Sequence, residues 1–495
     1  MKKIITLIFL LSIINLKATT HTVTTSADDG DGTLRKIIAD AKAGDSIIFA
    51  SNVDKIILTT EPITINKNLT IIGNSETKTS ISGNNESKVF VVLNMQNSVS
   101  FNVENLIIEN GKAVATSGGI DVYNYCTLIA KKCLFRNNEG YSGGAVFVFG
   151  NAFFTAINCY FNYNKTIGAG GSICVAERGS FTAINCAFIK NSIYAVSIGG
   201  NYYNANSNFI AINCAFVENK SEYYGAISIV GEGTIAIITN CTFNMNKAGI
   251  GGGAISMPYY KGQSLYLHHN TLDKNEAKTG GAIYADGTSK LYTYNSIFTG
   301  NTENGVVTAE GQIRGTISGD GKNLIEGVNG VTREKVFGNN EYKDCYIMPL
   351  EYAKSANRLT KIDIEIPEGM EADTLLSWLE TDIRGYKRPD TGFVTYGAVE
   401  YDSTYGIRED GTFDVLVLPN PTDRDFNIIF DNPQEQKITI DLVDIEGKII
   451  LNIFEGIANS GWQIYRVTEK LASGVYFVKI DFNGKLMVRK VVIQK

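Results

Sequence analysis

A short phrase recurs through the middle of this chain at intervals of 25 to 30 residues. Each copy is an apolar stretch built around Cys-x-Phe and followed by Asn, as in AINCAFIKN from Ala183 and AINCAFVEN from Ala211. A repeat of this length is typical of a solenoid, in which each repeat buries its apolar side only by stacking on its neighbours. The repeat therefore constrains the fold more than any other feature. The landmark positions are Cys133, Cys159, Cys186, Cys214, Cys241 and, in two decayed copies, Thr271 and Ser296.

The apolar residues within a copy alternate along the chain. Ile184, Cys186 and Phe188 fall on one side of an extended strand, and the residues between them fall on the other. Between the landmarks the chain is interrupted by Gly and Asn and has no amphipathic stretch long enough for a helical repeat. Short strands bent at such corners predict a parallel β-helix of about ten coils over residues 54–330.

The recurring Phe and Asn residues have structural roles in such a coil. The Phe side chains are predicted to form an aromatic stack in the interior. The Asn residues are predicted to lie at a corner, where Asn tolerates a left-handed backbone and its amide can bond to the next coil. The residues concerned are Phe135, Phe161, Phe188, Phe216 and Phe243, with Asn138, Asn164, Asn191, Asn219 and Asn246.

The chain has eight cysteines, and five of them hold the same repeat position. Neighbouring side chains that run parallel in such a ladder have poor disulfide geometry, so we interpret these cysteines as small buried hydrophobes. There is no CxxC motif and there are only three His, which argues against a metal site. The DDGDG segment from Asp28 is interpreted as a polar turn rather than a calcium loop. No metal or cofactor is predicted.

Residues 1–18 have two early lysines, an apolar run and a small residue, Ala18, at a plausible cleavage point. This arrangement predicts a secretory signal peptide, because the run is short for a membrane span. No later stretch is long and apolar enough to span a bilayer, so the mature chain is predicted to have no transmembrane segment. The net charge of −6 gives no electrostatic footprint for nucleic acid.

The repeats, FxxN followed by GGA-I, resemble the polymorphic outer-membrane protein repeats of bacterial surface adhesins. The resemblance implies a right-handed, single-stranded parallel β-helix. The segment TVTTSADDGDGTLRKIIADAKAGDSIIF, from Thr22, is similar to the N-terminal segment of large bacterial β-helix surface proteins. Residues 19–53 are therefore expected to form a cap, whose helix covers the open first coil and its pairing edge.

Residues 331–402 interrupt the repeat. The segment DIRGYKRPDTGFVTYGAVE, from Asp382, resembles the closing phrase of the same β-helix proteins. The resemblance implies that this region closes the C-terminal end of the β-helix, and we interpret its charged residues as a salt-bridged closure rather than an active site. The second Asp of the phrase is not cleanly present, which puts its ion pair in doubt. The matching residues are Asp382, Arg384, Gly385, Arg388, Gly397, Ala398 and Glu400.

Residues 411–495 alternate strand and turn signals, which predicts a small C-terminal antiparallel β-sandwich after the β-helix and an all-β chain overall. Pro419-Asn420-Pro421, the turn at 444–447, the phrase SGVY from Ser473 and the basic terminus resemble the C-terminal sorting domain of the type IX secretion system of the Bacteroidetes. The resemblance implies that residues 411–495 engage the type IX secretion machinery. It also implies a secreted or outer-membrane cell-surface location.

Binding and catalysis are the two functions that this fold suggests. Polysaccharide lyases and glycoside hydrolases occur on this fold, but they need paired carboxylates or an acidic calcium cluster on neighbouring coils. Here the repeat carboxylates are scattered over different repeat positions: Asp121, Glu139, Glu177, Glu218, Glu222, Glu232, Asp273 and Asp286. No catalytic residue is predicted, and an enzyme acting on pectin-like or host glycans stays the alternative.

Three tyrosine pairs favour a binding surface, because amphipathic tyrosines suit contact with glycans or proteins. A non-catalytic surface protein that binds a glycan or a host surface protein is therefore the preferred hypothesis, although Tyr is abundant throughout the chain. The predicted ligand contacts are Tyr202, Tyr203, Tyr223, Tyr224, Tyr259 and Tyr260.

Overall fold

The computed structural model describes residues 18–495 except 75–78, 169, 200–205, 259–261, 319–321, 338–350, 355, 358, 360–364, 367–369, 385–386, 390–392, 401–414, 419–425, 433–434, 445, 459–460, 483 and 494–495. The predicted signal peptide thus lies outside the described residues, apart from Ala18. The chain divides into two compact units. The first is Met1–Ile383 with Pro389–Glu400, and the second is Arg384–Arg388 with Tyr401–Lys495.

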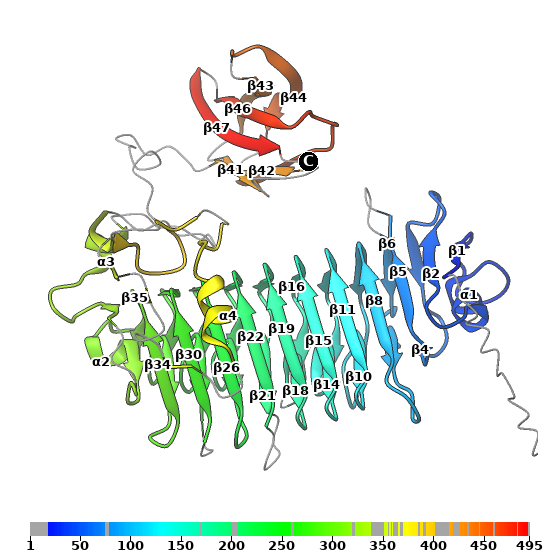
Figure 1. Cartoon of the computed structure of the whole chain (residues 1–495), viewed down its shortest axis with the longest axis horizontal. Helices are drawn as coiled ribbons and strands as arrows, with labels where there is room; N and C mark the ends of the chain where they lie inside the picture. Colours follow the sequence, from blue (N-terminus) through cyan, green and yellow to red (C-terminus); the bar gives the residue numbers. More distant parts are fainter. Residues whose placement is uncertain are drawn as a thin grey trace, which may run out of the picture. The chain divides into compact units, whose positions relative to one another are not determined.

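The first unit is a parallel β-helix built from three long parallel sheets (Figure 1). We call these sheets A, B and C, and each coil passes through C, A and B in turn. Each strand pairs in register with its equivalent in the next coil, so that Phe161, for example, pairs with Phe188. The predicted fold class is confirmed. Sheet A has eleven strands: β1 (Thr20–Val23), β2 (Ser46–Phe49), β5 (Leu69–Ile72), β8 (Ser100–Glu104), β11 (Thr127–Lys131), β15 (Phe153–Ile157), β19 (Ser180–Ile184), β22 (Asn208–Ile212), β26 (Ile235–Thr239), β30 (Ser264–His268) and β34 (Lys290–Tyr294).

Sheets B and C complete the coils, with short strands between them. Sheet B has eleven strands: β3 (Lys55–Ile57), β6 (Thr79–Ser82), β9 (Leu106–Glu109), β12 (Leu134–Arg136), β16 (Tyr160–Asn162), β20 (Ala187–Ile189), β23 (Ala215–Val217), β27 (Thr242–Asn244), β31 (Thr271–Asp273), β35 (Ile297–Thr299) and β38 (Leu324–Ile325). Sheet C has ten: β4 (Ile63–Ile65), β7 (Phe90–Val92), β10 (Ile120–Tyr123), β14 (Gly143–Phe149), β18 (Gly171–Ala176), β21 (Val196–Gly199), β25 (Ile227–Ile229), β29 (Ile255–Met257), β33 (Ile283–Ala285) and β37 (Ile313–Arg314). The corner after sheet B carries β13 (Glu139–Gly140), β17 (Lys165–Thr166), β24 (Lys220–Ser221), β28 (Lys247–Ala248), β32 (Glu276–Ala277) and β36 (Thr302–Glu303).

The interior contains the predicted aromatic stack. The rings of Phe135, Phe161, Phe188, Phe216 and Phe243 lie nearly parallel, with centroids 4.6 to 4.9 Å apart. A second stack from sheet A, Phe154, Phe181 and Phe209, meets the first edge to face. Offset and edge-to-face rings are the favoured aromatic geometries, so the two stacks join neighbouring coils through their cores.

The repeat asparagines form a buried ladder that continues through Asn275 and Asn301. Each side-chain amide of the ladder bonds to both neighbouring coils. Asn191 Nδ2, for example, donates to Phe161 O at 2.8 Å and to Asn219 Oδ1 at 3.0 Å. The predicted bonding between coils is confirmed, but the expected left-handed backbone at these residues is wrong. It falls on the preceding residue, such as Lys190 (φ 53°) and Glu218 (φ 52°), whose side chains point outward while the ladder amide points in.

The cysteine ladder is also buried, and all seven cysteines in the described part of the chain are free thiols. Their role is wider than that of small hydrophobes, because Cys214 N donates to Cys241 Sγ at 3.3 Å and Cys241 N donates to Asn270 Oδ1 at 2.9 Å. The equivalent of Cys241 in the next coil is therefore Asn270 and not the landmark Thr271, which pairs with Thr242. Ser296 continues the ladder by accepting from Asn270 N at 3.1 Å. The position requires an acceptor, and thiol, amide or hydroxyl can supply it.

The N-terminal coil carries the helix α1 (Leu34–Asp40), whose Thr33 side chain caps its first turn. Leu34 and Ile38 of this helix are buried in the same core as the coils. In the preceding polar segment, Asp28 accepts hydrogen bonds from the backbone amides of Thr59 and Thr60 at 2.8 and 3.0 Å. The Asp28 carboxylate is thus a tie between the segment and the first coils, which is how a polar turn is held.

The second unit contains two antiparallel sheets that share one apolar core. This agrees with the predicted C-terminal antiparallel β-sandwich. One sheet has β41 (Val415–Leu418), β42 (Phe426–Asn432) and β45 (Gly461–Val467). The other has β44 (Ile449–Ala458), β43 (Gln436–Val443), β46 (Gly474–Phe482) and β47 (Lys485–Ile493).

Candidate binding surface

The predicted ligand-contact tyrosines fall into two groups. Tyr202, Tyr203, Tyr259 and Tyr260 lie outside the described residues. Of the remaining pair, Tyr223 is 50% exposed, whereas Tyr224 is buried and its ring stacks on Tyr284 with centroids 6.2 Å apart. Tyr223 is therefore the predicted contact that the structure places at the surface.

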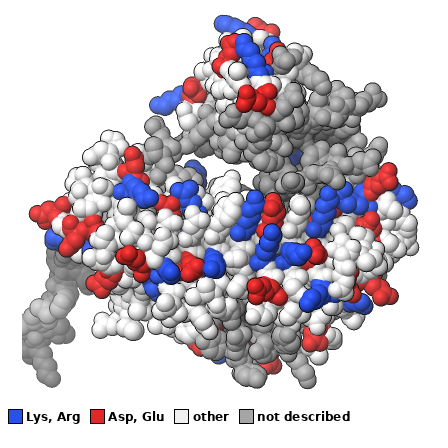
Figure 2. Space-filling view, turned by 180° about the vertical axis from the view of Figure 1, so that it is seen from behind, with Lys and Arg blue, Asp and Glu red and all other residues white. Residues whose placement is uncertain are grey.

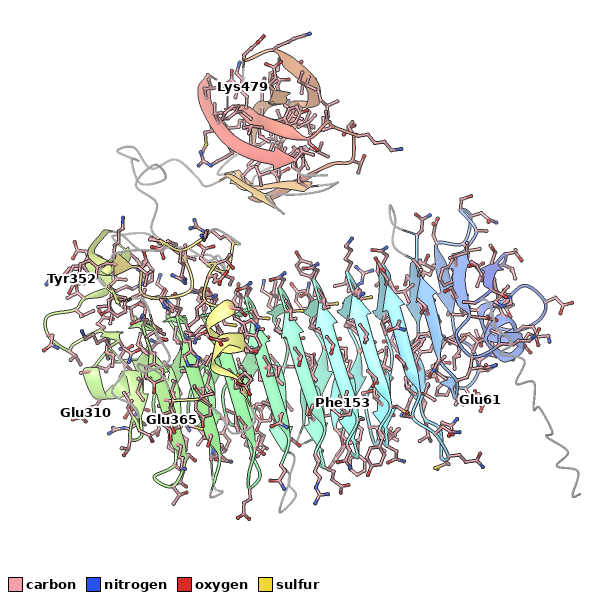
Figure 3. The ribbon with its side chains drawn as sticks, in the orientation of Figure 1. Glu61, Phe153, Glu310, Tyr352, Glu365 and Lys479 are labelled. Carbon is pink, nitrogen blue, oxygen red and sulfur yellow. The ribbon has the colours of Figure 1, made fainter. Side chains whose placement is uncertain are left out.

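Other aromatic side chains are exposed on the coil that contains β15 and β16. Phe153 (Figure 3), Tyr160 and Tyr163 are 46%, 48% and 55% exposed. The sequence reasoning missed them, although alternation was the signal that could have found Phe153 and Tyr160; Tyr163 follows β16 at a corner, with φ 55°, where alternation does not apply. Their neighbours Phe154 and Phe161 occupy the interior stacks, so the adjacent residues in each strand must face outward.

The outer side of sheet A has no charged side chain over β15, β19 and β22, and it mixes aliphatic residues with threonines, Ser180 and Asn208. We call six of these outward residues the open face: Phe153, Thr155, Ile157, Thr182, Ile184 and Ile210. Phe153 is exposed, and the other five side chains are partly exposed. Most are β-branched, so they hold a narrow range of rotamers and lose little freedom when another surface covers them.

A column of asparagines borders the open face at the corner between sheets A and B. Asn158, Asn185, Asn213 and Asn240 all have a left-handed backbone, with φ between 53° and 55°. Asn158 and Asn185 are exposed, Asn213 is partly buried and Asn240 is fully buried. The four residues therefore repeat one backbone geometry while their environment changes along the β-helix.

The environment changes because the chain covers its own last coils. The helix α4 (Ala372–Ser377) lies against the outer side of sheet A (Figure 1), where Leu375 is buried with Ile237, Tyr266 and Tyr294. Asn240 Nδ2 donates to Trp378 O and to Thr381 O, both at 2.8 Å. We call Ile366 and residues 370–383 the cover.

The closing phrase lies over the same end of the β-helix. Glu400 accepts from Thr395 N at 3.0 Å, and Asp382 accepts from Glu400 N at 2.9 Å. Gly397, with φ +85°, donates its amide to Asn295 O at 2.7 Å. These carboxylates hold backbone amides, which is a structural role. Arg388 is buried, and Gly385 lies outside the described residues.

Sheet B is covered at this end by a segment that includes α3 (Arg333–Phe337), η1 (Glu351–Ala353), β39 (Ala356–Asn357) and β40 (Phe393–Val394). Asp273 is fully buried there and pairs with Arg333, whose Nε lies 2.8 Å from Asp273 Oδ1. Thr299 Oγ1 also donates to Asp273 Oδ1 at 2.8 Å. Burial raises the pKa of Asp273, and the Arg333 guanidinium opposes that shift. The pair fastens the covering segment to the coils.

Other carboxylates that the sequence singled out are also engaged. Asp121 is fully buried and is bound by Lys88 and by the Ser117 amide and hydroxyl. Glu139 lies 3.3 Å from Lys165, and Glu218 lies 3.8 Å from Lys190. Figure 2 shows this alternation of Lys and Arg with Asp and Glu along the β-helix. Neighbouring opposite charges leave this surface without a strong field of one sign.

Burial holds several groups of the described coils in their neutral forms, among them Cys174 and His268. Burial raises the pKa of the Cys174 thiol to about 12, and burial lowers the pKa of His268 to about 3. The His268 ring stacks on Tyr294, and neither of its nitrogens has a hydrogen-bond partner among the described residues. A thiol this buried is protonated at neutral pH and lacks the thiolate that nucleophilic chemistry requires.

Comparison with known proteins gives a distant structural likeness and a family match. No curated protein matches the chain. A crystal structure of the enzymatically active domain of tailspike protein 4 from bacteriophage CBA120 is similar at 13% identity with a TM-score of 0.23. The match covers 94% of this chain and 65% of that one, so this chain spans less than two thirds of its length. A likeness at this level carries no argument about function.

The second unit gives the informative match. Residues 416–494 match the family described as Secretion system C-terminal sorting domain. Among the described residues, no helix combines the length and apolar character needed to cross a membrane. The sorting domain implies handling by the type IX secretion system, and the chain is therefore a secreted or cell-surface protein with a parallel β-helix body.

Proposed function

We propose that this protein is a non-catalytic binding rod, whose lateral surface holds a glycan or protein ligand outside the cell. The observation that carries the proposal is that one coil exposes three aromatic side chains, Phe153 in the open face of sheet A, and Tyr160 and Tyr163 along sheet B and the corner after it. Contiguous exposed apolar surface on a soluble protein marks interaction sites, and amphipathic aromatic residues are suited to them. The adhesin-type repeats that the sequence resembles fit the same proposal.

The engaged carboxylates favour binding over the alternative of a polysaccharide lyase or glycoside hydrolase. A general acid or a nucleophile must reach the glycosidic bond, and two such groups must stand at a defined separation. Asp121 and Asp273 are instead fully buried and bonded to Lys88 and Arg333. Their arrangement supports a role in holding the fold.

The test is a glycan array and a pull-down from host surface proteins with the exported full chain. We expect saturable binding that weakens about tenfold, or 1.4 kcal/mol, in the double variant Tyr160→Ala/Tyr163→Ala. Tyr352→Ala is the matched control, because Tyr352 is 42% exposed in η1 at the covered end, away from this coil. Blank results in both assays would refute the proposal, and new reducing ends or unsaturated sugars from a glycan panel would replace it with catalysis.

A further inference from the structure

We infer that the open face, with Asn158, Asn185 and Asn213, is a docking site for a polypeptide segment of a partner protein. The segment has large aliphatic or Trp side chains on one side and backbone carbonyls free to accept hydrogen bonds. The inference rests on the proposed function and commits it to one class of ligand. The chain already binds such a segment, its own cover, one coil further along.

The open face and the covered face are one continuous surface. In-register pairing places Ile157, Ile184, Ile212, Thr239 and His268 in a single outward column of sheet A. A second column runs through Ile210, Ile237 and Tyr266. The cover occupies the C-terminal part of both columns, since Leu375 is buried against Ile237 and Tyr266 while Ile210 lies at its edge. The N-terminal part of the same columns has no cover in the described residues.

The asparagine column supplies polar anchors in the same repeat. Asn240 gives both of its amide hydrogens to carbonyls of the cover, Trp378 O and Thr381 O. Asn213 occupies the equivalent position one coil earlier, with φ 54° against 53°. Asn213 is only partly buried, whereas Asn240 is fully buried under the cover. A side-chain amide nitrogen is a donor, so the position suits a ligand that brings backbone carbonyls to it, as the cover does to Asn240.

The chemistry of the surface selects a polypeptide over a charged polymer such as a nucleic acid or an acidic glycan. The open face has no charged side chain, so it offers nothing to the phosphates of a nucleic acid or to the carboxylates of an acidic glycan. Isoleucine and threonine side chains present aliphatic surface to water. Apolar side chains of a peptide can cover this surface, and removing it from water favours binding. The cover makes an apolar contact through Leu375 and a polar contact through the Asn240 side-chain amide, which donates to two of its backbone carbonyls. The asparagine column repeats the donor of that polar contact beside the open face.

The experiment uses a fluorescent synthetic peptide of residues 366–383 as the probe and the exported full chain as the receptor. We expect saturable binding in the micromolar range that is insensitive to salt. Ile184→Lys is expected to weaken binding by about tenfold or more, and Asn185→Ala by about threefold. Ile167→Lys is the matched control, because it makes the same change at a residue 48% exposed after β17, away from sheet A. Both Lys variants replace outward side chains, so unchanged circular dichroism checks their fold.

Three results would overturn the inference. The first is no saturable peptide binding, and the second is equal weakening by Ile184→Lys and Ile167→Lys. The third is concentration-dependent dimerisation that Ile184→Lys abolishes, which would assign the open face to a second copy of the chain. A positive glycan array with no peptide binding would refute this inference and leave the proposed function standing, whereas blank results in every assay would refute both.

Discussion

The coils around β19 and the coils around β30 share one backbone plan but differ in what their outer sides meet. In the first group the outer side of sheet A is Thr182 and Ile184, which remain partly in water. In the second group the equivalent residues are Tyr266 and His268, which are buried beneath the chain's own later segments. The regular copies extend through Cys241, whose coil already lies under the cover, and the two decayed copies follow it. The same coil can therefore carry either an open or a covered outer side.

The largest expected effect comes from the interior of the open coils. Phe188→Ala removes a ring stacked on both sides and leaves a cavity, so we expect a loss of about 3–5 kcal/mol in unfolding free energy. Leu272 holds the equivalent interior position in the covered coils and stacks on no ring, so Leu272→Ala is expected to cost less. Urea unfolding followed by circular dichroism measures both. Equal losses would mean that ring stacking adds nothing to the open coils.

The buried ion pair tests the attachment of the covered end. Asp273→Asn leaves Arg333 without its carboxylate, and we expect a loss of about 3 kcal/mol. The matched control is Glu276→Gln, which breaks the exposed pair with Lys247 and is expected to cost less than about 1 kcal/mol. Hydrogen exchange of residues 331–337 follows the detachment directly. A loss no greater than that of the control would show that the pair is not needed there.

A substitution in the cover is expected to cause the next largest loss of stability. Leu375→Ala should destabilise its packing on Tyr266 and Tyr294 by about 2 kcal/mol, since Leu375 is fully buried. The fluorescence of Trp378 reports whether the cover loosens before the coils unfold. If Trp378 and the β-sheet signal change together at the same denaturant concentration, the cover and the coils form one cooperative unit.

A smaller effect is expected in the acceptor ladder. Cys214→Ser keeps an acceptor but is smaller than a thiol, so we expect a loss of about 1 kcal/mol. Cys214→Val removes the acceptor and should cost more, although it is apolar and similar in size. Thermal unfolding of the two variants compares them. Greater stability of the Val variant would return the cysteines to the role of simple hydrophobes.

The N-terminal cap is predicted to respond to acid. Hydrogen bonds hold the pKa of Asp45 down to about 2. The largest contribution comes from the His21 side chain, and smaller ones come from the backbone amides of Thr19 and Lys42. Because this folded pKa lies below the unfolded value, the contribution of Asp45 is present above about pH 4 and is lost as the pH falls towards 2. Hydrogen exchange of residues 18–49 at a series of pH values measures the loss, and Asp45→Asn should remove the dependence.

Local sequence patterns predicted the interior of the β-helix correctly. Alternation placed Phe188 and Cys214 inside, and the repeat spacing predicted stacked coils. The same patterns misplaced the left-handed residue by one position, at Asn191 instead of Lys190, because they do not tell which of two adjacent polar residues turns inward. The cover could not be predicted, since Asn240 meets Trp378 across 138 residues and no periodicity links the two segments. The exposed Phe153 and Tyr160 were accessible to the same alternation argument and were overlooked.

The central claim is that one continuous outer surface of sheet A is open over β19 and covered over β26. Maleimide labelling of Ile184→Cys and Ile237→Cys in the full chain, read by mass spectrometry of the labelled peptides, tests it most directly. Ile184 is partly exposed and Ile237 is 4% exposed, and the cysteines of the described coils are buried. The account predicts rapid labelling at position 184 and strong protection at position 237, which Leu375→Ala relieves. Equal labelling at the two positions would contradict it.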